Sequence, residues 1–178
     1  ARQLKRRHWN YQKQSNISFI SSNDFSLYDN VLDTTILLGA IPKRFEHLKD
    51  EELYFAMARG NDTCVAMEMT KWFNTNYHYI VPEISKETTF KLNSKKIIEE
   101  YEEAKELGIK TKINLLGPIT YLGLSKSIDS SDVFFHINNV VKVYKELLEE
   151  ISKFDDEIIV QFDEPLFVRD IDTKILSL

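Results

Sequence analysis

The alternation of helical and extended patterns along the chain limits its fold more than any other feature of the sequence. Helical spacing of apolar residues predicts helices over residues 1–14, 28–38, 51–57, 94–107 and 133–154. Short apolar-rich runs predict strands over residues 17–25, 112–120 and 158–162, and a further apolar and aromatic run covers residues 63–82. Strands that alternate with helices in this order are typical of parallel sheets with right-handed crossover connections.

The number of strand candidates sets the fold class. About four candidates are too few to close an eight-stranded barrel, so the sequence predicts an α/β fold that is either a partial (βα)8 TIM-type barrel or a small open sheet. No repeat, low-complexity segment or Pro/Ser-rich linker divides the chain, and we expect one incomplete domain over residues 1–178. The chain opens with a pattern typical of the last turns of a helix and with no capping residue, so we also expect a preceding segment.

Composition and charge exclude several classes of function. The net charge is −5 and the pI is about 5.5, so no global field attracts nucleic acid or anionic lipid. The basic cluster from Arg2 to Arg7 could suggest a nucleic-acid-binding arm, but it is better explained as the solvated face of a helix end. Without a membrane-spanning apolar run or a leader peptide, a cytoplasmic protein is expected. The single cysteine, Cys64, excludes an internal disulfide and fits a reducing compartment.

The densest group of polar and aromatic side chains lies between Glu68 and Tyr79. In one interpretation this segment forms a concave site, where Lys71 and Asn76 meet a polar, anionic ligand and the rings supply stacking surface. In the other interpretation it is a buried strand with hydrogen-bonded amides and a structural His78. The residues alone favour neither interpretation.

Asp163 and Glu164 follow directly after the last predicted strand, where a barrel has its catalytic rim. Adjacent carboxylates at that place can serve acid–base chemistry, metal binding or cation recognition. The simpler interpretation is that they cap a helix or bind the amides of a loop. Gly117 and Pro118 predict a tight turn that lets the backbone approach the barrel mouth.

Nucleophilic and metal-dependent chemistry find no support in the sequence. The four histidines are scattered and Cys64 has no CxxC partner, so no metal site is expected. The five glycines form no phosphate-binding pattern, and no Gly-x-Ser-x-Gly elbow is present. We therefore assign no catalytic residue and no metal ligand to this chain.

The run from Glu68 to Glu83 closely resembles the signature of the N-terminal domain of the cobalamin-independent methionine synthase family. Four further segments resemble the same domain in the same order. They are Arg7-His8-Trp9 with Gln12-Lys13-Gln14, Asp24-Phe25 with Tyr28-Asp29 and Val31-Leu32, Leu116-Gly117-Pro118-Ile119-Thr120, and Gln161-Phe162-Asp163-Glu164-Pro165. The resemblance extends over essentially the whole chain.

The resemblance implies a two-barrel methyltransferase that transfers the methyl group of 5-methyltetrahydrofolate polyglutamate to homocysteine and forms methionine. It implies zinc in the full-length enzyme, where a C-terminal catalytic barrel that is absent from this chain holds the homocysteine sulfur as a thiolate. Lys71 and Asn76 are the best matches to family residues that contact the folate polyglutamate, and Asp163 and Glu164 are expected to be structural. The implied partners are the folate and the C-terminal barrel, and the fragment alone is expected to be inactive.

A different class of function stands beside this one: a stand-alone binding or interaction module derived from the domain, without methyltransferase activity. The mass of the natural gene product separates the two hypotheses, because the enzyme requires a much longer chain. In the family, a further folate-binding element, a Gly-Phe-Pro-Arg-type strand with an Arg-Glu-Leu-Lys-type helix start, would precede Ala1. Half a barrel would expose edge strands and apolar faces, which favour self-association or disorder.

Overall fold

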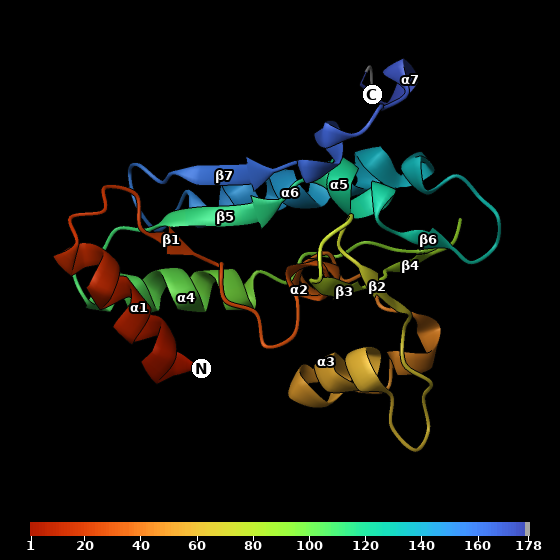
Figure 1. The fold of residues 1–178 in the computed structure, drawn as a ribbon, viewed down its shortest axis with the longest axis horizontal. Coiled ribbons are helices and arrows are strands. Elements are labelled where there is room, and N and C mark those ends of the chain that lie inside the picture. The colour runs from red at the N-terminus through yellow and green to blue at the C-terminus, as the bar shows by residue number, and fades with distance from the viewer. Residues whose placement is uncertain (177–178) are drawn as a thin grey trace.

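A three-stranded parallel sheet organises the fold (Figure 1). The computed structural model describes residues 1–176, and its main sheet contains β1 (Ser21–Ser22), β5 (Lys112–Leu116) and β7 (Val160–Asp163) in the order β1-β5-β7. Ser22 pairs with Ile113 in parallel register. Because helices connect these strands, the predicted α/β class with a parallel sheet is confirmed, whereas the strands within residues 1–176 do not close a barrel.

Helices pack around this sheet and beyond its edges. They are α1 (Arg2–Gln14), α2 (Asn30–Leu37), α3 (Asp50–Arg59), α4 (Lys95–Glu106), α5 (Pro118–Gly123), α6 (Ile137–Ile151) and the short α7 (Thr173–Leu176), with 3-10 turns at Lys43–Phe45, Val133–His136 and Pro165–Val168. In α6, buried side chains recur at Val140, Val143, Tyr144 and Leu147, which is the spacing of one helix face. This face packs into the main core together with β5.

Two small sheets complete the fold. β4 (Glu83–Ile84) and β6 (Lys126–Ser127) are parallel, whereas β2 (Met69–Lys71) and β3 (His78–Ile80) form an antiparallel hairpin. The expectation of parallel strands is therefore wrong for this hairpin. The connection of residues 72–77 is too short for a crossover, so the chain returns antiparallel to the strand it has just left.

Two predicted strands are shorter than expected, each for a local reason. The strand predicted over residues 17–25 contains only β1, because Asn23 turns the chain away with a φ of +57°. The strand predicted over residues 112–120 ends with β5, because Pro118 occupies the first turn of α5, where proline is favoured.

The sequence predicts a serine cap at the start of α4 and a glycine stop at its end, and only the glycine acts as predicted. Ser94 precedes the helix as predicted, but its side chain makes no capping hydrogen bond. Gly108 adopts a φ of +66° just beyond the helix, which is the left-handed conformation that commonly ends helices.

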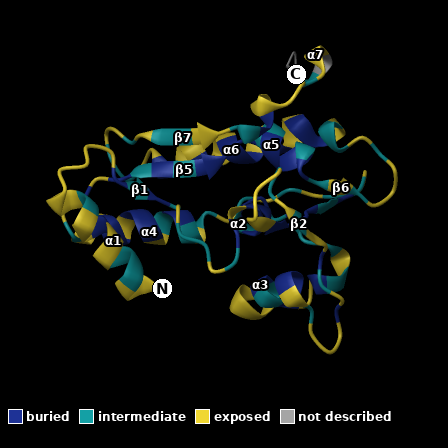
Figure 2. Ribbon diagram, viewed as in Figure 1, coloured by how far each residue is buried: buried dark blue, intermediate teal, exposed yellow. Residues whose placement is uncertain are grey.

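Buried apolar side chains form three clusters (Figure 2). The largest joins β5 to α5 and α6, the second lies among α2, α3 and β3, and the third contains Trp9, Ile20, Ala104 and Ile109. Figure 2 shows buried residues along β5 and exposed ones along β7. Within residues 1–176, no helix has both the length and the apolar character needed to cross a bilayer.

The basic cluster near the N-terminus lies on α1 and faces an acidic row on α4. Six ion pairs within residues 1–176 join the two helices, two from each of three cations. Among them are Arg2–Glu103, Lys5–Glu100 and Arg6–Glu106, at 3.1, 3.2 and 3.2 Å. The cluster is therefore not simply a solvated helix face, as the sequence suggested, because three of its cations bind carboxylates within the chain.

Candidate functional site

The β2–β3 hairpin positions both predicted ligand-binding residues. Lys71 ends β2 and lies opposite His78 in the antiparallel register. Between the strands the backbone N–H of Trp72 donates to the carbonyl of Tyr77 at 2.7 Å, and Phe73 adopts a φ of +52°. The tip that carries Asn76 is thus a closed turn with its own hydrogen bonds.

Lys71 and Asn76 are both exposed. Neither the ammonium of Lys71 nor the side-chain amide of Asn76 makes a hydrogen bond or ion pair with another residue of the described range 1–176. An ammonium donates to carboxylates, and an amide both donates and accepts, so the two groups can bind an external polar anion. His78 is exposed as well, so the buried-strand interpretation applies to Tyr79 and Ile80 but not to these three side chains.

Aromatic rings pack on one another around the turn. Trp72 makes edge contacts with Phe73, Tyr77 and Tyr79, at ring-centroid distances of 5.2, 6.2 and 5.8 Å. The guanidinium of Arg169 lies 4.6 Å from the centre of the Phe73 ring. Edge contacts of this kind stabilise a cluster, so the rings hold the turn in place. Tyr77 is 46% exposed and leaves part of its ring accessible to a ligand.

A buried carboxylate ties the base of the hairpin to α2. Asp29 is fully buried, and its Oδ1 accepts hydrogen bonds from the N–H groups of Val31 and Leu32 at 2.8 and 2.9 Å. Its Oδ2 accepts from the N–H of Ile80, the last residue of β3, at 3.0 Å. Burial raises the pKa of Asp29 from 3.8 to about 6, against the opposing effect of these hydrogen bonds. The sequence placed Asp29 in a segment that resembles the family but indicated no role for it, although an aspartate just before a helical pattern is a capping signal.

The raised pKa of Asp29 predicts a pH-dependent contribution to stability. Between about pH 4 and 6 the native state binds a proton that the unfolded chain does not, so stability contributed by Asp29 is present at low pH and lost as pH rises through 6. The loss is on the order of 1–3 kcal/mol. Asparagine cannot titrate, so the difference in unfolding free energy between wild type and Asp29→Asn should shrink over that range in urea titrations. A constant difference would contradict the raised pKa.

Glu164 binds the first turn of α5. Its carboxylate accepts hydrogen bonds from the N–H groups of Ile119 and Thr120 at 3.0 and 2.7 Å. The simpler interpretation of the adjacent carboxylates, amide binding, is therefore confirmed for Glu164. Asp163 is exposed and accepts a hydrogen bond from the Gln161 side chain at 2.7 Å.

The approach of Glu164 explains the glycine opposite it. A Cβ on Gly117 would lie 2.1 Å from Cδ of Glu164, closer than any real contact. The N–H of Gly117 donates to the carbonyl of Asp163 at 2.8 Å, so the backbone just after β5 lies against the end of β7. The predicted approach to a barrel mouth stays a prediction.

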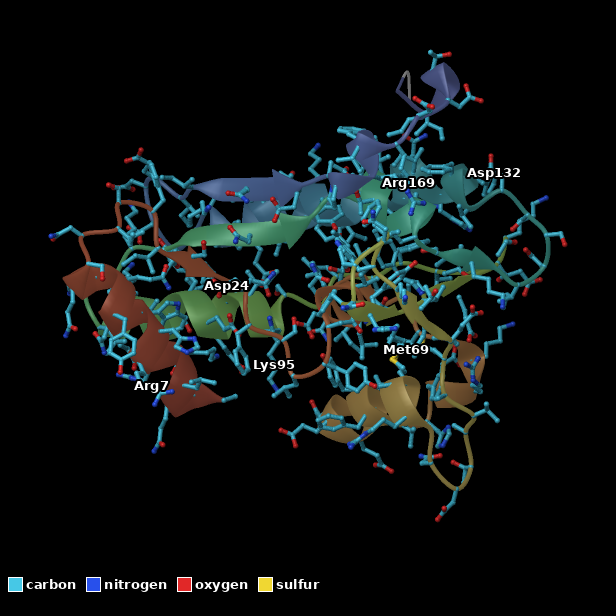
Figure 3. The ribbon with its side chains drawn as sticks, in the orientation of Figure 1. Arg7, Asp24, Met69, Lys95, Asp132 and Arg169 are labelled. Carbon is cyan, nitrogen blue, oxygen red and sulfur yellow. The ribbon has the colours of Figure 1, made fainter. Side chains whose placement is uncertain are left out.

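A large groove lies away from the hairpin. The groove has a volume of about 880 Å³ and is lined by residues of α1, α2, α3 and α4. Neither Lys71 nor Asn76 lines it. Figure 3 labels one residue of each region, Lys95 for the groove and Met69 for the hairpin. Lys71 and Asn76 therefore lie on an exposed surface outside this groove.

The described residues provide no donor set for zinc. Among residues 1–176, no group of three or more histidine, cysteine, aspartate or glutamate side chains could hold a metal ion. His136 is buried with its Nε2 2.8 Å from the carbonyl oxygen of Ser85, and Cys64 is buried with its thiol donating to the carbonyl of Arg44. No step of metal chemistry can be assigned to these residues.

Comparison with known proteins gives one consistent family. The sequence model of the cobalamin-independent synthase, N-terminal domain, matches residues 1–178. A 5-methyltetrahydropteroyltriglutamate–homocysteine methyltransferase of Desulforamulus reducens is 59% identical over 100% of this chain and 24% of that protein. The enzyme of the same name from Xylella fastidiosa is 46% identical over 98% of this chain and 24% of that protein. A chloroplastic enzyme of this name from Arabidopsis thaliana is 45% identical over 99% of this chain and 22% of that protein.

The chain spans about a quarter of the length of these curated relatives. The matched range nevertheless includes every segment on which the sequence resemblance rests. Because the family model matches the whole of residues 1–178, this chain belongs to the family of cobalamin-independent synthase N-terminal domains.

Proposed function

We propose that this chain is the folate-binding and scaffolding part of a methyltransferase that transfers a methyl group from 5-methyltetrahydrofolate polyglutamate to homocysteine. In this proposal Lys71 and Asn76 bind the glutamate tail. The observation that carries this proposal is that the side chains of Lys71 and Asn76 are exposed on a closed hairpin. Neither side chain has a partner within residues 1–176. The curated relatives are named as methyltransferases acting with a triglutamate folate, which supplies the substrate class.

The chemistry of the tail suits this pair of residues. Each added glutamate brings a carboxylate, which the ammonium of Lys71 can neutralise through a charge-assisted hydrogen bond. The Asn76 amide can donate to a carboxylate and accept from a peptide N–H of the tail. These residues bind and orient the substrate, and none of them takes part in bond making.

We further propose that the parallel sheet is part of a (βα)8 barrel that docks on a second, catalytic barrel in the longer protein. The parallel order β1-β5-β7, with helices between successive strands, supports this proposal. In this proposal zinc would be held in the catalytic barrel, where it would stabilise the homocysteine thiolate. The described residues of this chain offer no set of ligands for it. A single cysteine without a partner thiol is consistent with a cytoplasmic enzyme.

The proposal predicts a division of activity that can be assayed directly. The 178-residue chain should form no methionine from homocysteine and a triglutamate folate with zinc supplied, because its described residues cannot hold a thiolate. The complete protein that carries this chain in frame should form methionine under the same conditions. Turnover by the short chain above a blank without protein would refute the division, and an inactive complete protein would favour the stand-alone module.

A further inference from the structure

Asp29 lies where two parts of the molecule meet. It precedes the first turn of α2 and caps that helix through Oδ1, while Oδ2 reaches across 51 residues of sequence to the N–H of Ile80. The two oxygens of one carboxylate therefore serve different elements. Because the side chain is fully buried, water cannot replace either set of bonds without entering the core.

The bond to Ile80 fixes the strand that leads out of the hairpin. Ile80 pairs with Met69, so holding Ile80 also holds the start of β2. Two residue pairs further along the same ladder lie Lys71 and His78. A displacement at the base of this two-stranded ribbon also moves its tip, because the strands pair over only three residues each.

Other anchors hold the hairpin but do not duplicate this bond. The hydroxyl of Tyr79 donates to the carbonyl of Leu124 at 3.1 Å, and the side chain of Ile80 is buried in the second core cluster. These two contacts act through side chains, which can change rotamer. Backbone bonds hold the segments on either side of the hairpin, where the N–H of Met67 donates to the carbonyl of Met57 at 2.9 Å and the N–H of Lys126 donates to the carbonyl of Pro82 at 2.8 Å. Neither of these bonds joins the hairpin to α2. The Asp29–Ile80 bond acts on the backbone itself and so sets the position of β3 relative to α2.

We propose that Asp29 is a positioning residue for the folate site: it locks the β2–β3 hairpin to α2 so that Lys71 and Asn76 meet the glutamate tail in one orientation. This inference rests on the proposed function of those two residues. Asp29 touches no substrate and acts only through the hairpin.

Replacement by asparagine separates the two roles of the carboxylate. Asparagine is as good a helix cap as aspartate, so its oxygen keeps the bonds to Val31 and Leu32. Its amide nitrogen then faces the N–H of Ile80, and two donors cannot bond. Asp29→Ser is a second variant, since serine also caps helices but is too short to bridge to β3.

Asp132→Asn provides a matched control. Asp132 also caps a helical turn, accepting from the N–H of Phe134 at 2.9 Å, and it is exposed and distant from the hairpin in sequence (Figure 3). The same chemical change there leaves the cap in place and affects no second element. Asp132→Asn should therefore behave as wild type in every measurement.

The first measurement is hydrogen exchange of hairpin amides in the complete protein, read by mass spectrometry of peptides that cover residues 69–80. Asp29→Asn and Asp29→Ser should each speed exchange there about tenfold, and Asp132→Asn should not. Unchanged exchange in both Asp29 variants would overturn the proposed lock.

The second measurement is steady-state kinetics with a triglutamate folate. Asp29→Asn should raise the folate KM about threefold to tenfold and leave kcat and the homocysteine KM unchanged. If Asp29 acts through Lys71 and Asn76, adding Asp29→Asn to the double variant Lys71→Ala/Asn76→Ala should not raise the folate KM further. A further rise by the full factor seen for Asp29→Asn alone would overturn the positioning role. An unchanged KM in Lys71→Ala by itself would instead refute the proposed function, and the exchange data would still decide whether Asp29 locks the hairpin.

Discussion

Replacing Lys71 with alanine in the complete methyltransferase is expected to raise the KM for polyglutamylated folate about tenfold to a hundredfold, with little change for homocysteine. The ammonium of Lys71 has no partner within residues 1–176, so a tail carboxylate would be its first ion pair. Lys71 is exposed, and solvent weakens such a pair, so the loss should be roughly 1–3 kcal/mol, as for one charge-assisted hydrogen bond. Kinetics with folates of short and long tail measure this effect, which should grow with tail length.

Lys142→Ala is the control for this prediction. Lys142 is also an exposed lysine, but it lies on α6, away from the hairpin in sequence. Its loss should leave both KM values unchanged. If Lys71 only covers the hairpin with its alkyl stem, Lys71→Ala should lower the melting temperature and shift the kinetics of both substrates together. That result would remove Lys71 from the folate site.

Gly117→Ala is expected to destabilise the chain by about 2–4 kcal/mol, although its φ of −74° is comfortable for alanine. The new Cβ would lie 2.1 Å from Cδ of Glu164 and 2.3 Å from Oε1, so the carboxylate must move. It would then give up its hydrogen bonds to the N–H groups of Ile119 and Thr120. Urea unfolding of the variant measures the loss.

A double-mutant cycle tests whether Glu164 is the cause. Glu164→Ala removes the atoms that the new Cβ would meet and also removes the two hydrogen bonds. In that background Gly117→Ala should cost almost nothing, which gives a large interaction energy between the two positions. An equal cost of Gly117→Ala in both backgrounds would show that some other contact of Gly117 matters.

Local patterns in the sequence were enough for the elements that bury one regular face. The helices α1, α4 and α6 and the strand β5 lie within the predicted segments, and β7 extends one residue beyond its predicted segment. Periodicity failed where tertiary contacts or turn geometry decide the backbone. The residues Ile119 and Thr120 looked like the end of a strand, but Pro118 and the carboxylate of Glu164 make them the first turn of α5.

The candidate site could be predicted only in part, for a similar reason. Lys71 and Asn76 were candidates from the density of polar side chains, and the family resemblance assigned them to the folate. The structure adds that both are exposed and without partners within residues 1–176. The role of Asp29 depends on a contact with Ile80, 51 residues away, that no local pattern reveals. A capping signal could identify its two bonds to α2 but not the third bond, which reaches the hairpin.

The pairing of α1 and β1 with distant segments also sets the order in which the chain can assemble during synthesis. Arg2 bonds to Glu103 across 101 residues, and Asn23 bonds to Asn114 across 91. At about 5–20 residues per second, a ribosome needs roughly 5–20 s to make that stretch. Throughout this interval Trp9 and Ile20 have no core to enter, because their partners Ala104 and Ile109 do not yet exist. Residues 1–22 are thus among the last of this chain to fold, and until then these apolar side chains have no buried site.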